Sequence, residues 1–183
     1  MEIFRLIQSL ENDNSTKLSR LLVLIYELSG EKHLKGVESV NKLAKLDFLM
    51  TSPTLLRRIV YKPNAANKIV LSEHEINSIE SKLIFYRYNP WDTGFRKLIN
   101  ILVAMGLTEI DIKDIHYNIV ITQKGIQVVH ELYKFKGFDE YRIRGKLINT
   151  YLGSYSDNYL KKFFNEKFPE LSTLYSTYDE HEI

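Results

Sequence analysis

The chain has 183 residues, enough for one substantial domain or two small ones, and 44% of them are hydrophobic, as in a globular protein. Its formal net charge is +2, so the total charge does not indicate a strong nonspecific binder of nucleic acid. The absence of cysteine excludes disulfides, thiolate metal sites and a cysteine nucleophile. No stretch approaches the roughly 20 apolar residues of a membrane helix, and charged residues interrupt the N-terminus. We therefore expect a soluble, cytoplasmic protein with no membrane partner.

The first half of the chain has the apolar spacing of helices. Ser15 precedes a segment with one apolar face, which Gly30 closes; that face consists of Leu18, Leu21, Leu22, Ile25 and Leu28. A second helix is predicted over 37–50, and Ser52-Pro53 predicts the start of a third, because proline at the first helical position loses no hydrogen bond. Residues 62–71 are predicted as an irregular link. A capping-box pattern then predicts a helix from residue 72, and residues 83–88 predict a strand.

The order of elements from Asp92 to Phe135 is the most informative feature of the sequence. Apolar residues recur at helical spacing from 95 to 105, in a helix that Asp92 caps and Gly106 ends. Residues 107–112 and 117–122 are predicted as two short strands, joined by a polar connection into an antiparallel hairpin. Thr122 is predicted to cap a further helix. This order is what a winged helix-turn-helix module requires, with the hairpin as its wing.

Beyond residue 136 the pattern stays helical. Apolar residues from 143 to 151 mark one helix ended by Gly153, and Ser156 caps another that stops near Pro169. We predict a mainly α protein with a small β component (α+β). Its helical and winged-helix core covers residues 1–136, with the wing hairpin at 107–122. A C-terminal helical extension, an appended hairpin of helices, covers 137–178, and residues 179–183 form a disordered tail.

The sequence has no pattern typical of catalysis. The five histidines are scattered without the spacing of metal ligands. The phosphate-binding loops GxxxxGK[ST] and GxGxxG are absent, and so is the GxSxG nucleophile turn. Glu73, Glu75 and Glu80 share one predicted helix and indicate a solvated face rather than paired acid and base groups. We therefore expect no catalytic residue, no cofactor and no metal, and a protein that is not an enzyme.

The helix before a wing commonly enters the DNA major groove. The possible DNA contacts are Arg96, Lys97 and Asn100 on that helix, and Arg142, Arg144 and Lys146 in the densest basic cluster. However, Ile101, Val103 and Ala104 would place apolar surface beside the phosphate backbone. Asp111 and Asp114 of the wing would be repelled by that backbone. We therefore favour a winged module that faces protein, with direct DNA contact as the alternative.

The stretch YRYNPWD, residues 86–92, holds the only tryptophan. Pro90 fixes the backbone, so Trp91 is delivered at a set point just before the helix. Two interpretations remain open. Trp91 either pins the corner into the core, or it is an aromatic anchor for a partner's pocket, as interface hot spots often are.

YRYNPWD followed by FRKLINILVAMGL, together with VNKLAKLDFLMTSPTLLRRIV earlier, resembles the middle component of bacterial ABC three-component systems, including the Lamassu type of anti-phage defence. The resemblance spans roughly residues 18–133. Asn89 stands where family members commonly have glycine, and asparagine also tolerates left-handed backbone. Such components are similar to the small winged-helix subunits of SMC complexes.

The resemblance implies a non-enzymatic adaptor that binds an SMC-like or Rad50-like ABC ATPase. This adaptor would couple the ATPase, associated with DNA, to a nuclease-type or other effector in anti-phage or anti-plasmid defence. ATP and metal would belong to those partner subunits. The candidate contacts with partners are Leu46, Phe48, Arg57, Tyr88, Pro90, Trp91 and Arg96. The alternative is a stand-alone winged-helix transcriptional regulator, which would bind a palindromic site as a dimer with a steep dependence on salt.

Overall fold

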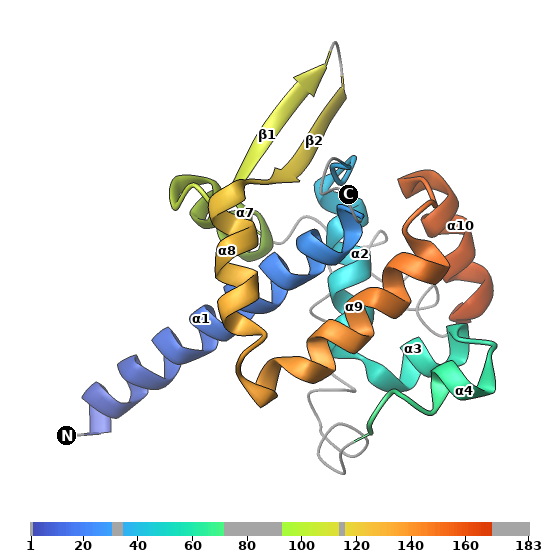
Figure 1. Ribbon diagram of the computed structural model, residues 1–183, viewed down its shortest axis with the longest axis horizontal. Helices are drawn as coiled ribbons and strands as arrows, with labels where there is room; N and C mark the ends of the chain where they lie inside the picture. Colours follow the sequence, from blue (N-terminus) through green and yellow to red (C-terminus); the bar gives the residue numbers. More distant parts are fainter. Residues whose placement is uncertain (1, 31–34, 72–92, 114–115, 170–183) are drawn as a thin grey trace, which may run out of the picture.

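The computed structural model describes residues 2–30, 35–71, 93–113 and 116–169 (Figure 1). They form a mainly helical structure with one small antiparallel sheet, which confirms the α+β class. In chain order the elements are α1 (Glu2–Leu28), α2 (Val40–Thr51), α3 (Pro53–Ile59), α4 (Pro63–Ala66), α7 (Thr93–Ala104), β1 (Thr108–Lys113), β2 (His116–Ile121), α8 (Gln123–Leu132), a short 3-10 helix (Lys136–Phe138), α9 (Asp139–Leu152) and α10 (Asp157–Lys167). The predicted helix from residue 72, the strand 83–88 and the cap Asp92 lie outside the described residues.

Helix α1 is the element around which the others pack. The five consecutive residues from Leu21 to Ile25 are each at most 1% exposed, so this stretch is buried on every side rather than along one face. Helices α2, α7, α8 and α9 and strand β2 all contact α1. The helix begins at Glu2, well before the predicted start at Ser15, and its first half extends beyond the other elements (Figure 1). Gly30 follows its end with a φ of +74°, as predicted.

An ion pair holds α1 against α2. Arg20 donates from Nε and Nη2 to the two carboxylate oxygens of Asp47, at 2.9 and 3.0 Å. Burial lowers the pKa of Arg20, but the charge of Asp47 and its hydrogen bond outweigh burial and raise that pKa overall. Arg20 therefore stays charged, and its two hydrogen bonds to Asp47 link α1 to α2.

The C-terminal helices share this core and are not an appendage to it. Their buried apolar residues belong to the same cluster as those of α1 and α2; they are Leu147, Ile148, Leu152, Leu160, Phe164 and Phe168. Gly145 allows α9 to approach closely, because a Cβ there would lie 3.0 Å from Glu27 Cγ and 3.1 Å from Met50 Cε. In the described part of the chain, the predicted boundary at residue 136 thus does not separate two hydrophobic cores.

Strands β1 and β2 form the predicted antiparallel hairpin. Thr108 lies opposite Ile121 and Lys113 opposite His116, so pairing runs one residue further into the predicted connection from each side. Val37 adds a short bridge on the other edge of β2, through two hydrogen bonds of 2.9 Å with Ile119. The hairpin is thereby tied to the segment that leads into α2.

Backbone conformation and side-chain caps confirm several predicted boundaries. Gly106 ends α7 with a φ of +68°. Thr122 Oγ1 accepts a hydrogen bond from Gly125 N at 3.1 Å, and Ser156 Oγ accepts one from Tyr159 N at 3.2 Å. In contrast, the predicted irregular link at 62–71 contains the short helix α4.

Gly125 brings α8 against the base of the hairpin. A Cβ at this position would lie 2.2 Å from Leu107 O and 2.8 Å from Ile121 Cγ1. No local pattern in the sequence marks this glycine, because its role depends on Leu107, which is distant in the chain. The close approach aligns the hairpin with α8.

We expect Gly125→Ala to destabilise the protein by about 2 kcal/mol, because backbone must move to admit the methyl group. This expectation opposes intrinsic helix propensity, which favours alanine by about 1 kcal/mol. Urea unfolding of both proteins measures the difference. Gly137→Ala is the matched control, since nothing lies within 4 Å of a Cβ there. A Gly125→Ala protein as stable as the parent would contradict the close approach.

Candidate functional site

Among the described residues, no three His, Asp or Glu side chains gather as they would to hold a metal ion. The described helices also include none that is long and apolar enough to cross a membrane. The remaining candidates are the exposed surfaces of the hairpin and of α7, and the pockets beside α8.

The outer half of the hairpin exposes apolar side chains. Thr108, Ile110 and Ile112 share one face with their partners Ile121, Ile119 and Tyr117, because directly opposed residues and residues two apart lie on the same side of a sheet. Ile119 is fully buried where the hairpin meets the core, whereas Ile110 is 40% and Ile112 is 70% exposed. One continuous apolar face therefore begins in the core and ends in solvent.

The opposite face of the hairpin carries two carboxylates along β1. Glu109 is exposed and Asp111 is half-buried, and they lie opposite Val120 and Asn118. Both carboxylates would repel phosphate. The described part of the hairpin thus combines exposed apolar side chains with carboxylates.

Helix α7 places three of the predicted DNA contacts on its exposed side. Arg96, Lys97 and Asn100 are all exposed and lie at helical spacing. Three residues of α7 were expected to expose apolar surface. Ala104 is exposed, but Ile101 and Val103 are half-buried. The outer side of α7 is therefore more polar than the sequence predicted.

The predicted basic cluster on α9 is divided between the interior and the surface. Arg144 is 2% exposed and lies on the face of α9 that packs on the core. It donates to Met50 O at 3.2 Å, to Val70 O at 3.4 Å and to Glu140 Oε2 at 2.8 Å. The prediction of Arg144 as a DNA contact is therefore wrong in this structure, whereas Arg142 and Lys146 remain exposed one helical turn apart.

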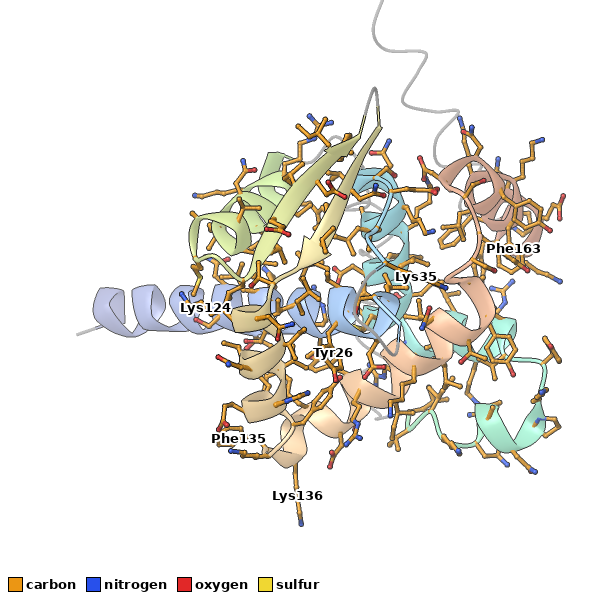
Figure 2. All side chains as sticks on the ribbon, turned by 45° about the horizontal axis from the view of Figure 1, so that its top comes forward. Tyr26, Lys35, Lys124, Phe135, Lys136 and Phe163 are labelled. Carbon is orange, nitrogen blue, oxygen red and sulfur yellow. The ribbon has the colours of Figure 1, made fainter. Side chains whose placement is uncertain are left out.

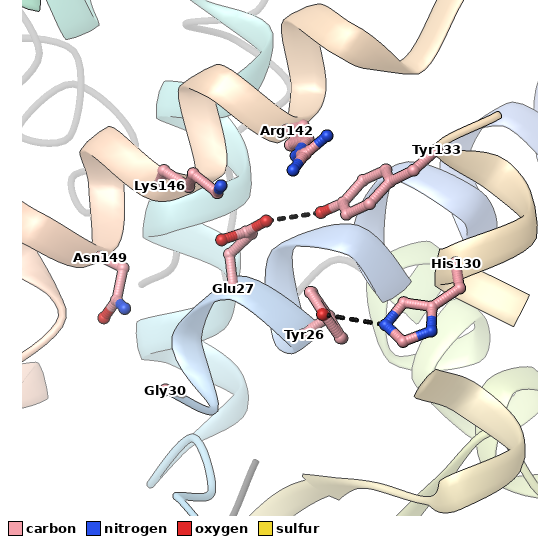
Figure 3. A pocket seen from close by; sticks show the side chains of 8 residues that line it. All are labelled: Tyr26, Glu27, Gly30, His130, Tyr133, Arg142, Lys146 and Asn149. Carbon is pink, nitrogen blue, oxygen red and sulfur yellow. Dashed lines mark hydrogen bonds between the residues drawn. The ribbon is translucent and has the colours of Figure 1, made fainter. Parts of the chain in front are cut away.

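A pocket of about 420 Å³ lies between the end of α1, the end of α8 and α9 (Figure 3). Its lining consists of Tyr26, Glu27, Gly30, His130, Tyr133, Arg142, Lys146 and Asn149. The exposed basic residues of α9 thus face a polar hollow and do not form a stripe along the surface.

The hydroxyl groups in this pocket are engaged in hydrogen bonds between the helices. Tyr133 donates to Glu27 Oε1 at 2.6 Å, and the Tyr26 hydroxyl is 3.2 Å from His130 Nε2 (Figure 3). Burial raises the pKa of Tyr133, and the hydrogen bond and charge of Glu27 raise it further, so the hydroxyl stays protonated as a donor. Arg142 covers the Tyr133 ring, with Cζ 4.8 Å from the ring centroid. The network joins α1, α8 and α9.

A shallow second pocket follows one side of α8. Lys124 and Phe135 lie near its two ends (Figure 2), with Val128 and Leu132 between them. Phe135 is 63% exposed. Lys124 and Glu131 give this side of the helix charges of both signs.

The upstream motif contributes little accessible surface. Leu46 is fully buried and Phe48 is 3% exposed, so the prediction that they contact a partner is wrong for the chain in this conformation. Their helix α2 is buried on several sides. Of the three candidates in this motif, Arg57, on α3, is the exposed one. The candidates Tyr88, Pro90 and Trp91 lie outside the described residues.

Comparisons with protein-family models, with curated proteins and with solved structures give no match for this chain. The resemblance to the middle component of ABC three-component systems, and the winged-helix assignment that goes with it, therefore remain predictions from sequence motifs.

We expect Arg144→Met to destabilise the protein by about 2 to 3 kcal/mol, because two backbone carbonyls would lose a charged donor in a buried place. Lys146→Met, two residues away on the exposed side, should change the free energy of unfolding by about 0.5 kcal/mol or less. Urea titrations of the two variants measure this contrast. Equal stability of both variants would show that Arg144 has no structural role.

Proposed function

We propose that the chain is a non-enzymatic adaptor subunit that binds a partner protein. The observation that carries this proposal is the outer half of the hairpin, with Ile110 and Ile112 exposed on one face and Glu109 and Asp111 on the other. Burying exposed apolar side chains stabilises protein contacts, whereas the carboxylates disfavour a nucleic-acid backbone.

In this proposal, α7 and the hairpin are the last helix and the wing of a winged helix-turn-helix module. Two observations support the assignment. The hairpin follows α7 directly after Gly106, and Val37, between α1 and α2, forms an isolated bridge to Ile119 of β2. The wing would then face a protein rather than the backbone of DNA.

The sequence motifs suggest which partners such an adaptor has. We propose an SMC-like or Rad50-like ABC ATPase as the direct partner and a nuclease-type or other effector as the second. The adaptor would couple the state of the ATPase, associated with DNA, to the effector in bacterial anti-phage or anti-plasmid defence. ATP and metal chemistry would then belong to the partner subunits.

A transcriptional regulator is the second candidate, and the exposed side of α7 favours it. Arg96, Lys97 and Asn100 share that side and are suitable for base and phosphate contacts. The carboxylates of the hairpin oppose this function, because a wing beside α7 would lie against the same DNA backbone.

Co-purification tests the adaptor function. The tagged chain, co-expressed with an SMC-like or Rad50-like ATPase of the same genome, should retain that ATPase. Ile112→Lys should lower the retained amount at least about tenfold, because it puts a charge into the proposed apolar contact. Phe135→Lys is a matched control, since it replaces another exposed apolar residue on a different surface. If the wild-type chain never retains the ATPase, the adaptor function is wrong.

A gel shift with the chain alone on DNA from its own promoter tests the regulator function. Under the adaptor proposal we expect no sequence-specific complex, and weak binding that disappears at physiological salt. A specific complex that Arg96→Ala and Lys97→Ala both weaken would instead establish the regulator. Lys162→Ala, on exposed α10, is the control for loss of a positive charge elsewhere.

A further inference from the structure

The hydrogen-bond register of the hairpin determines which backbone groups of β1 point away from β2. Ile110 lies opposite Ile119. The N–H of Ile119 donates a hydrogen bond to Val37, and its C=O accepts one from Val37, both on the far edge of β2. Residues of an antiparallel pair alternate between hydrogen-bonded and non-hydrogen-bonded positions. Ile110 is thus at a non-hydrogen-bonded position, as are Thr108 and Ile112. These three residues direct their N–H and C=O groups toward the outer edge of β1.

Within the described residues, no strand pairs with that outer edge. The sheet consists of β1 and β2, and the bridge to Val37 lies on the opposite side of β2. The hairpin also stands out beyond the helices (Figure 1). Ile110 and Ile112 expose their side chains as well as directing their backbone groups outward. Such an edge is a template for another strand.

We propose that the outer edge of β1 binds an extended segment of a partner protein as an added strand, and that this segment alternates apolar and basic side chains. The inference rests on the proposed adaptor function and specifies the partner's binding segment. On one face of the enlarged sheet, apolar residues of the segment would cover Ile110 and Ile112. On the other face, lysine or arginine would lie beside Glu109 and Asp111, where opposite charges are favourable neighbours across strands.

In the register centred on Ile110, the same charges disfavour a second copy of this chain as the occupant. Two β1 strands paired about Ile110 would place Glu109 opposite Asp111 at two positions. Like charges directly opposite each other destabilise an antiparallel pair. A segment with basic residues at these positions turns both repulsions into attractions.

A synthetic peptide tests the inference. A labelled peptide of about eight residues, alternating valine and lysine, is long enough to cover the six-residue strand β1. Fluorescence anisotropy with the full chain should show binding that is at least about tenfold tighter than for the same peptide with glutamate in place of lysine. Glu109→Lys should reduce this preference, because it removes one of the carboxylates that select for lysine.

A proline at position 112 distinguishes binding through backbone hydrogen bonds from binding through side-chain contacts alone. Ile112→Pro removes an N–H that points outward and leaves the hydrogen bonds between β1 and β2 in place. We expect it to weaken peptide binding at least about tenfold, while Ile112→Val, which keeps the N–H, stays within about twofold. Circular dichroism confirms that both variants are folded.

Several results would overturn the inference. Unchanged binding by Ile112→Pro would exclude backbone pairing, and equal affinity for the lysine and glutamate peptides would exclude the charge preference. A dimer of the chain alone that Ile112→Pro dissociates would identify a second copy as the occupant. Co-purification separates this failure from that of the adaptor function. If the Ile112→Pro variant retains the ATPase as fully as the wild-type chain, the edge of β1 is not the binding site, but the adaptor function is still supported. If neither the variant nor the wild-type chain retains the ATPase, the adaptor function itself is wrong.

Discussion

Burial of α1 on every side is the constraint on which the rest of the structure depends. A helix normally buries one stripe and leaves its other faces to water. Leu21 to Ile25 leave no such face, so helices and a strand must cover this stretch from all directions. The ion pair of Arg20 and Asp47 links it to α2, and Gly145 lets α9 pack closely against both α1 and α2. The C-terminal helices are thus as necessary to this core as the elements that precede them.

This arrangement makes the hairpin a fixed projection. Its base is held by Ile119 and Ile121 in the core, by the bridge to Val37 and by the contact of α8 at Gly125. Within the described part of the chain, its outer half has no comparable cover, so apolar side chains continue into solvent along a strand that is already extended. Binding of a partner strand would lose little conformational entropy in β1, because the folded core has already fixed the backbone of this strand.

Local signals in the sequence predicted several helix boundaries well. Gly106, Thr122 and Ser156 act through neighbours a few residues away, so a linear pattern is enough to identify them. Arg144 shows where such a pattern fails. The basic cluster groups it with Arg142 and Lys146, each two positions away. Because a helix turns by about 100° per residue, it places residues two positions apart on different faces. Its spacing from Leu147 and Ile148 was the available signal that Arg144 belongs to the buried side.

Other features required the tertiary structure. Leu46 and Phe48 were expected at a surface because their motif resembles one in a family that works in complexes, yet the packing of α1, α9 and α10 buries their helix. The close contact at Gly125 and the outward direction of the backbone at Ile110 depend on strand pairing and register. A single sequence does not contain this information in any local pattern.

Hydrogen–deuterium exchange of the full chain, alone and in complex with the co-expressed ATPase, tests most directly whether the hairpin binds protein through its outer edge. The account predicts that the amides of Ile110 and Ile112 exchange rapidly in the chain alone and become protected in the complex, while those of Glu109 and Asp111 are protected in both because they pair with β2. Unchanged exchange at Ile110 and Ile112 in the complex, with protection confined to α7 or appearing only when duplex DNA is added, would contradict it.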